Sequence, residues 1–112
     1  MIKIHIPETV KIAGCVYSVD REEKSFVNGS NVVDGTHSFF EQKIKVVREG
    51  TEDYQSVVFL HELMHGIIEN YCPNIVSAAD EEKLVEQISK GLFQVVTDNP
   101  EIFKEVKSVE HS

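Results

Sequence analysis

The chain has 112 residues, 41% hydrophobic and 27% charged, a balance typical of one globular domain with a single core. Nineteen acidic residues against eleven basic ones give a net charge of −8. This charge argues against a nucleic-acid-binding protein, because such proteins need clustered lysine and arginine to neutralise phosphates.

The sequence also argues against membrane insertion and secretion. The first residues, MIKIHIPE, lack the continuous apolar run of a signal peptide, and no segment approaches the length of a membrane span. Cys15 and Cys72 form no CxxC pair, so we interpret them as reduced, partly buried thiols. We therefore expect a cytoplasmic protein.

The first 50 residues carry the alternation of apolar and polar residues that is typical of strands. Residues 2–6, IKIHI, alternate in this way, and TVKIAGCVYSVD repeats the pattern around a turn or bulge at Gly14. Asn28-Gly29 predicts a second turn. The segment GTHSFFEQKIKVVREG predicts a further strand, with one face exposed to solvent. These features predict a small, mostly antiparallel sheet over residues 1–50.

Helical signals begin after residue 50. Thr51 is a good N-cap for a helix over residues 51–72, which Pro73 ends. A second helix over residues 77–97 is capped by Ser77 or Asp80. Its expected apolar stripe consists of Leu84, Val85, Ile88, Leu92, Val95 and Val96.

Pro100 suits the first position of a short final helix over residues 100–109. Strands therefore come first and helices follow, which predicts the α+β class and a single domain spanning residues 1–112.

The motif HELMH, residues 61–65, places polar side chains in a hydrophobic helix. His61 and His65 are four residues apart, about 40° around the helix, so both rings can reach one ion at about 2.0–2.1 Å. Glu62 lies about 100° away and can instead act on a water molecule beside that ion. This is the HExxH pattern of two metal ligands and one general base.

A zinc site of this kind needs a third protein ligand, which we expect from the second helix. Glu81, Glu82 and Glu86 are the candidates. Glu81 falls on the apolar stripe but lies in the first turn, where a capping role suffices. Glu82 and Glu86 both border the stripe, and helical spacing favours neither of them.

The chain resembles the gluzincin metallopeptidases, in which two histidines and one glutamate hold zinc. More closely, it is similar to the small phage- and prophage-type metallopeptidases related to the ImmA/IrrE and SprT-like proteins. The similar stretches are TVKIAGCVYSV, GTHSFFEQKIKV, VVFLHELMHGIIENY and EEKLVEQISKGLFQVVTDNPEIF. The resemblance implies a zincin-like fold with the sheet packed on the HExxH helix.

The resemblance also implies site residues: His61 and His65 as zinc ligands and Glu62 as the base. Gluzincins often place a small residue three positions after the ligand glutamate, which favours Glu86, followed by Ser89, over Glu82. Two features depart from the relatives. Many gluzincins have an acidic residue where this chain has Lys90, and no third histidine of the SprT type follows before His111.

These observations predict a zinc-dependent metallopeptidase acting on a peptide or protein substrate. We expect an extended substrate to pair with an edge strand between Phe39 and Val47. Tyr54, Tyr71 and His37 are candidates for stabilising the oxyanion, with none preferred.

Two alternatives to a peptidase remain. One is a non-catalytic, zinc-stabilised module of phage origin that binds a peptide or protein. The other is a structural helix whose histidines bind no metal.

Overall fold

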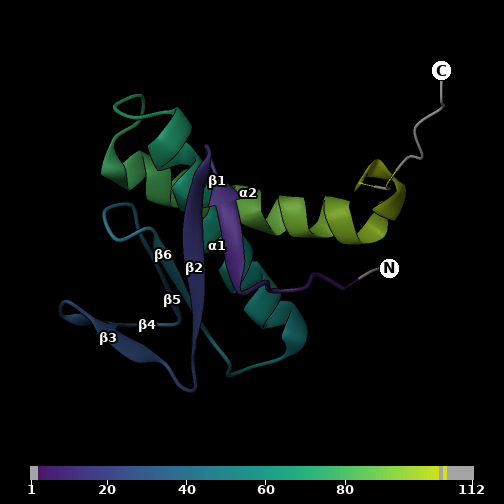
Figure 1. The fold of residues 1–112 in the computed structure, drawn as a ribbon, viewed down its shortest axis with the longest axis horizontal. Coiled ribbons are helices and arrows are strands. Elements are labelled where there is room, and N and C mark those ends of the chain that lie inside the picture. The colour runs from purple at the N-terminus through teal and green to yellow at the C-terminus, as the bar shows by residue number, and fades with distance from the viewer. Residues whose placement is uncertain (1–2, 104, 106–112) are drawn as a thin grey trace.

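The structure is a computed structural model that describes residues 3–103 and 105. These residues form an α+β fold, as predicted, with a mixed sheet and two long helices (Figure 1). In chain order the elements are β1 (Thr9–Ile12), β2 (Cys15–Glu22), β3 (Phe26–Asn28), β4 (Asn31–Val33), β5 (Gly35–Ser38), β6 (Lys43–Val47), α1 (Glu52–Tyr71), α2 (Ala78–Asp98) and a 3-10 turn, η1 (Pro100–Phe103).

The main sheet has the strand order β1-β2-β6-β5, and β3 and β4 form a separate hairpin. The pairings β1–β2, β3–β4 and β5–β6 are antiparallel, whereas β2 and β6 are parallel. The two predicted turns are present. Ala13 and Gly14 link β1 to β2 with φ of 52° and 81°, and Gly29 has a φ of 66° in the β3–β4 turn.

Two predicted strands differ from the structure. Residues 3–8 form no strand, although Ile4 and Ile6 pack against the core as their alternation implies. The segment from Phe39 to Val47 is not one strand either. Residues 39–42 are a turn, and β6 lies between β2 and β5 inside the sheet. The edge strand on this side of the sheet is therefore β5.

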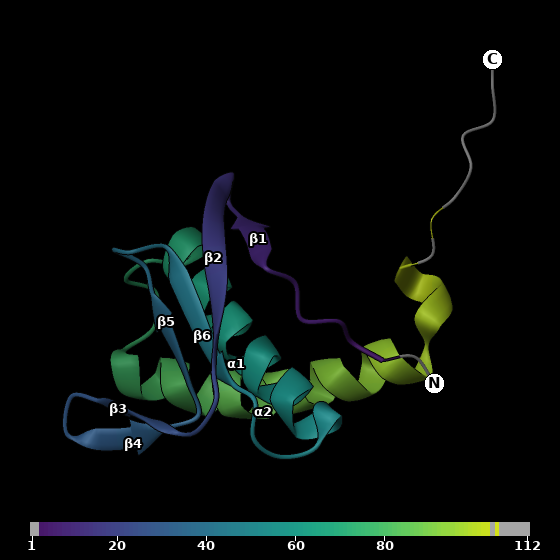
Figure 2. The same ribbon diagram turned by 60° about the horizontal axis from the view of Figure 1, so that its bottom comes forward.

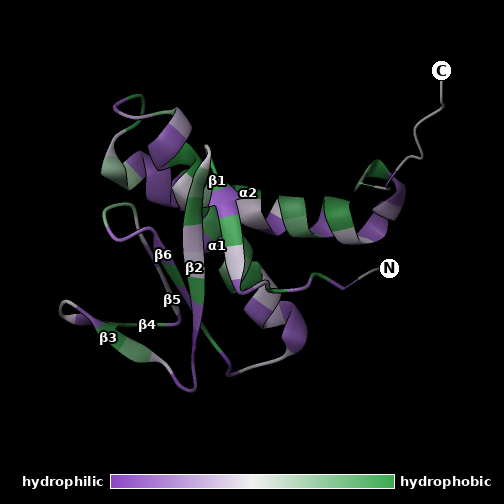
Figure 3. Cartoon of the chain, viewed as in Figure 1, coloured by the Kyte–Doolittle hydropathy of each residue, from purple (hydrophilic) through white to green (hydrophobic). Residues whose placement is uncertain are grey.

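The core lies between the sheet and α1, and α2 packs on α1 (Figure 1). Buried apolar side chains from β1, β2, β6 and α1 form it: Ile12, Tyr17, Val19, Ile44, Val46, Phe59 and Leu60. Leu92 and Phe93 of α2 add to this cluster. Figure 2 shows the C-terminal half of α2 projecting beyond the sheet, with both hydrophobic and hydrophilic turns along it (Figure 3).

Both long helices begin at the predicted caps. The hydroxyl oxygen of Thr51 accepts a hydrogen bond from the Tyr54 N–H at 3.0 Å, and that of Ser77 accepts from the Asp80 N–H at 3.1 Å. Pro100 begins a turn of four residues; the remainder of the helix predicted over 100–109 falls largely outside the described residues.

The structure also bears on the cysteines and on the apolar length of the helices. Cys15 and Cys72 are free, partly buried thiols, as predicted. Within the described residues, neither long helix has the apolar length that a membrane crossing requires.

Candidate metal centre

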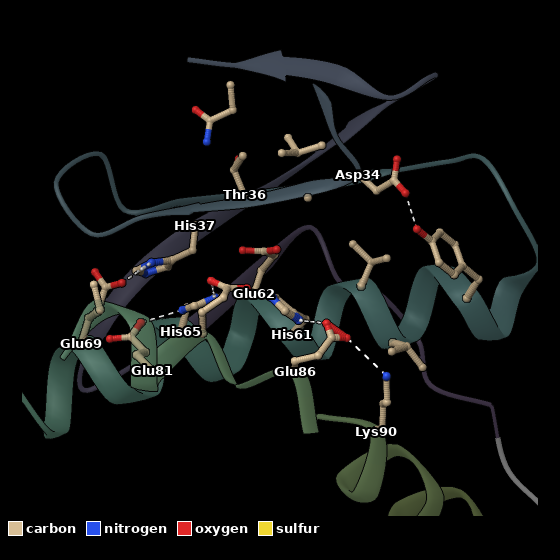
Figure 4. Close-up of a pocket in the computed structure, with 18 of the residues that line it drawn as sticks. Asp34, Thr36, His37, His61, Glu62, His65, Glu69, Glu81, Glu86 and Lys90 are labelled. Carbon is tan, nitrogen blue, oxygen red and sulfur yellow. Dashed lines mark hydrogen bonds and ion pairs between the residues drawn. The ribbon is translucent and has the colours of Figure 1, made fainter. Parts of the chain in front are cut away.

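Helix α1 places both motif histidines on the wall of a cavity. The ring centroids of His61 and His65 are 5.0 Å apart, and their side chains are 18% and 13% exposed. One helical turn separates them, so the two rings project in the same direction (Figure 4). The site therefore begins with two imidazoles that can share one ion.

Glu82 of α2 lies opposite both rings. One carboxylate oxygen is 3.1 Å from Nε2 of His61, and the other is 3.2 Å from Nε2 of His65. One ligand atom from each of the three residues lies within 4.8 Å of the others. Two imidazole nitrogens and a carboxylate oxygen are the donor set of many zinc sites, so these residues fit that ion.

The predicted third ligand, Glu86, lies farther from the histidines. Its carboxylate is 4.0 Å from Nδ1 of His61 and also pairs with Lys90 at 3.5 Å, and it is not part of the cluster around both rings (Figure 4). The geometry therefore favours Glu82 over Glu86 as the third ligand.

The rotation of α2 explains this difference. The expected stripe included Leu84, Ile88 and Val95, but these side chains are 43%, 45% and 41% exposed. The buried face instead contains Val85, Ser89 and Thr97. The centre of this buried face is turned by about 90° from that of the expected stripe, which brings Glu82 to within about 10° of it.

The two polar residues on this buried face, Ser89 and Thr97, form hydrogen bonds within their own helix. Ser89 donates its hydroxyl hydrogen to the Val85 carbonyl, and Thr97 donates to the Phe93 carbonyl, each at 2.7 Å. Because both hydroxyls are satisfied within the helix, these small side chains are buried without an unpaired polar group. A stripe drawn from apolar residues alone misses them.

Glu81, expected to act only near the helix start, holds the ring of His65. Its carboxylate oxygen lies 2.6 Å from Nδ1 of His65, and its side chain is 15% exposed. A carboxylate at this distance favours the tautomer with a hydrogen on Nδ1, which leaves the Nε2 lone pair facing Glu82. Such a partner orients a metal-binding histidine.

Glu62 is 8% exposed, and burial raises the pKa of its carboxyl group to about 7. Strand β5 packs directly over it at Gly35. A Cβ at that position would lie 3.0 Å from a Glu62 carboxylate oxygen and 2.7 Å from Cγ1 of Val58. The absence of a side chain at Gly35 therefore makes room for the predicted base.

These groups line a cavity of about 1040 Å³ between β5 and the two helices. Its lining includes His61, Glu62 and His65 from α1, together with the three glutamates of α2. The cavity is strongly acidic, because Lys90 is the single Lys or Arg among the described residues that line it. A divalent cation bound there would offset part of this negative charge.

The three oxyanion candidates occupy different positions. Tyr54 and His37 line the cavity, whereas Tyr71 does not and is 64% exposed at the end of α1. The Tyr54 hydroxyl donates to Asp34, and this carboxylate raises the pKa of the phenol to about 12. Tyr54 is therefore a neutral hydrogen-bond donor at one side of the cavity.

The free edge of β5 lies beside this site. The Val47 N–H donates to the Asp34 carbonyl at 2.8 Å, and hydrogen-bonded and non-hydrogen-bonded pairs alternate along an antiparallel ladder. The backbone groups of Gly35 and His37 therefore point away from β6. Because β5 is an edge strand, they are open to an added strand.

Sequence reasoning missed two residues of this region. In the sequence, Gly35 is an ordinary member of a strand-like segment. Only its packing against α1 shows that this position has no room for a side chain. Glu69 lies one turn after His65, so the spacing His61, His65, Glu69 was an available signal. Comparisons with protein-family models, curated proteins and solved structures find nothing that matches the chain.

Proposed function

We propose that the chain is a zinc-dependent peptidase in which His61, His65 and Glu82 hold the metal. The observation that carries this proposal is the convergence of three ligand atoms within 4.8 Å of one another on the wall of an open cavity. A bound zinc ion supplies Lewis-acid polarisation of a carbonyl group and lowers the pKa of water. The chain itself must then move protons and position the substrate.

Glu62 is the proton carrier in this proposal. Burial raises the pKa of its carboxyl group in the metal-free chain. In this role Glu62 accepts a proton from the attacking water and releases it afterwards. The released proton goes to the amine that leaves when the peptide C–N bond breaks. Burial, with Gly35 of β5 packed over it, keeps this carboxylate from being fully hydrated and so favours uptake of a proton.

The edge of β5 supports a peptide as the substrate. The outward backbone N–H and C=O groups of Gly35 and His37 offer hydrogen bonds to an extended chain. Gly35 also lies against Glu62, so a paired peptide would pass close to the base. This proposal replaces the strand between Phe39 and Val47 with β5 as the docking edge.

The decisive experiment uses Glu62→Gln and a mixture of internally quenched random peptides. We expect hydrolysis by the wild type and a fall in kcat of about 10²–10⁴-fold in the variant, since the base is lost. Zinc content, measured by elemental analysis, should stay unchanged. Glu41→Gln, an exposed carboxylate in the β5–β6 turn, is the matched control and should keep full activity.

Two results would contradict this proposal. Hydrolysis by Glu62→Gln at the wild-type rate would remove Glu62 as the base. A wild type that binds zinc and the peptides without cutting them would instead be the non-catalytic binding module.

A second pair of variants tests which glutamate is the third zinc ligand. Glu82→Gln should lose zinc affinity, whereas Glu86→Gln should keep it; the reverse pattern would restore Glu86 as the ligand.

A further inference from the structure

A buried histidine without a hydrogen-bond partner lies next to the metal centre. The His37 side chain is 2% exposed and stacks on the Tyr17 ring at a centroid distance of 5.5 Å. Within residues 3–103 and 105, neither of its ring nitrogens has a hydrogen-bond partner. An unsatisfied buried polar group costs about 1–3 kcal/mol, so this position calls for a ligand.

The orientation of the ring indicates where that ligand would bind. Nε2 faces Gly66, where an added Cβ would be 3.3 Å away, and Nδ1 faces Glu69 (Figure 4). The distance from Nδ1 to the nearest Glu69 oxygen is 3.7 Å, too long for a hydrogen bond. Two atoms that bind one ion at about 2.0–2.2 Å lie about 3.3–4.2 Å apart, so the gap fits an ion between them.

A second carboxylate, that of Glu81, lies beside Glu69. One ligand atom from each of His65, Glu69 and Glu81 lies within 4.8 Å of the others, in a group that shares His65 with the one around Glu82. In the described part of the chain, the ion-pair partners of Glu69 and Glu81 are histidines, and no lysine or arginine pairs with either. Burial, and after it the charge of Glu81, raise the pKa of the Glu69 carboxyl group.

We propose that His37, Glu69 and Glu81 bind a second divalent transition-metal cation beside the zinc centre. An imidazole nitrogen with two carboxylates suits Zn²⁺ or Mn²⁺ better than Mg²⁺ or Ca²⁺, which take oxygen ligands. Glu81 links the two sites, since one oxygen accepts from His65 while its carboxylate remains able to bind the ion. The second ion goes beyond the proposed peptidase activity and does not depend on it.

This cation would hold together the three walls of the cavity. His37 belongs to β5, Glu69 to α1 and Glu81 to α2. Among the described residues, no strand pairs with the outer edge of β5. The ion would therefore fix the docking edge relative to the HExxH helix.

The test counts binding sites by titrating metal-free protein with Zn²⁺ in a calorimeter. We expect about two ions per wild-type chain, and about one in each of Glu69→Gln and Glu82→Gln. Glu41→Gln should keep both. A single ion in the wild type, lost in Glu82→Gln and kept in Glu69→Gln, overturns the second site and leaves the peptidase proposal intact. Binding that Glu69→Gln abolishes and Glu82→Gln spares overturns the peptidase centre and supports the second site.

A measurement on the unaltered protein guards against misfolded variants. In ¹⁵N spectra of the histidine side chains, Nδ1 of His37 should shift as the second equivalent of Zn²⁺ binds, because the nitrogen gains a metal bond. A His37 signal that stays in place at saturating zinc overturns the proposal.

Discussion

Individual residues of the HExxH motif were predictable because they share one helix. The relative positions of His61, Glu62 and His65 follow from helical geometry alone, and the structure places both rings on the cavity wall. The third carboxylate was not predictable in this way. It depends on how α2 is rotated against α1, and the buried face of α2 contains two polar residues, Ser89 and Thr97, whose hydroxyls are satisfied within the helix.

The buried position of Glu62 makes folding stability depend on pH. Its pKa of about 7 in the folded chain exceeds the ordinary value of 4.5, so the folded state binds the proton more tightly than the unfolded state. The stabilising effect is complete below about pH 4.5 and is lost as the pH rises to about 7. For metal-free protein this loss amounts to about 3 kcal/mol.

Glu62→Gln should remove this dependence. Between about pH 4 and pH 8, the free energy of unfolding of the metal-free wild type should fall by about 3 kcal/mol relative to that of the metal-free variant. Urea unfolding at both pH values measures this, and Glu41→Gln should follow the wild type. Parallel pH profiles for the wild type and Glu62→Gln would contradict the buried, raised-pKa state of this carboxyl group.

At the scale of elements, helix ends were predictable and strand pairing was not. Thr51, Ser77 and Pro73 are local signals, and α1 and α2 begin and end within a residue or so of the expected positions. The predicted strand over residues 39–47 failed because its first part is a turn, in which Gln42 has a φ of 53°. Which strand lies at the edge depends on the parallel β2–β6 pairing, which joins distant segments and leaves no local signal.

The close approach of β5 to α1 gives a prediction for Gly35→Ala. The new Cβ would meet Val58 at 2.7 Å and Glu62 at 3.0 Å, so we expect a loss of about 1–3 kcal/mol in unfolding free energy. Displacement of Glu62 should also lower peptide hydrolysis, while zinc content stays unchanged.

Gly91→Ala is the matched control for that substitution. An added Cβ at Gly91 has nothing within 4 Å, and alanine favours a helix interior over glycine by about 0.5–1 kcal/mol. Urea unfolding should therefore show opposite signs for the two glycine substitutions. Equal effects would mean that β5 does not press on Glu62.

At the scale of the whole molecule, the metal centre and the fold are thermodynamically linked. The described core is small, and α2 contributes Val85, Leu92 and Phe93 to its packing, whereas Leu84, Ile88 and Val95 remain exposed. An ion bound by His61, His65 and Glu82 would therefore add a tie between α1 and α2 where apolar packing is thin. Any ligand that binds only the folded chain stabilises it in proportion to the logarithm of its concentration.

Removing the metal should consequently lower the melting temperature. With free zinc at about 1,000 times its dissociation constant, the stabilisation is about 4 kcal/mol, or roughly 10–20 °C for a domain of this size. Calorimetric scans with and without a chelator measure the shift. The double variant His61→Ala/Glu69→Gln lacks a ligand at each site. Its melting temperature should therefore be the same with and without the chelator. If the chelator also leaves the melting temperature of the wild type unchanged, HELMH belongs to a structural helix without a metal. Removal of a bound ion would change the stability of the folded state.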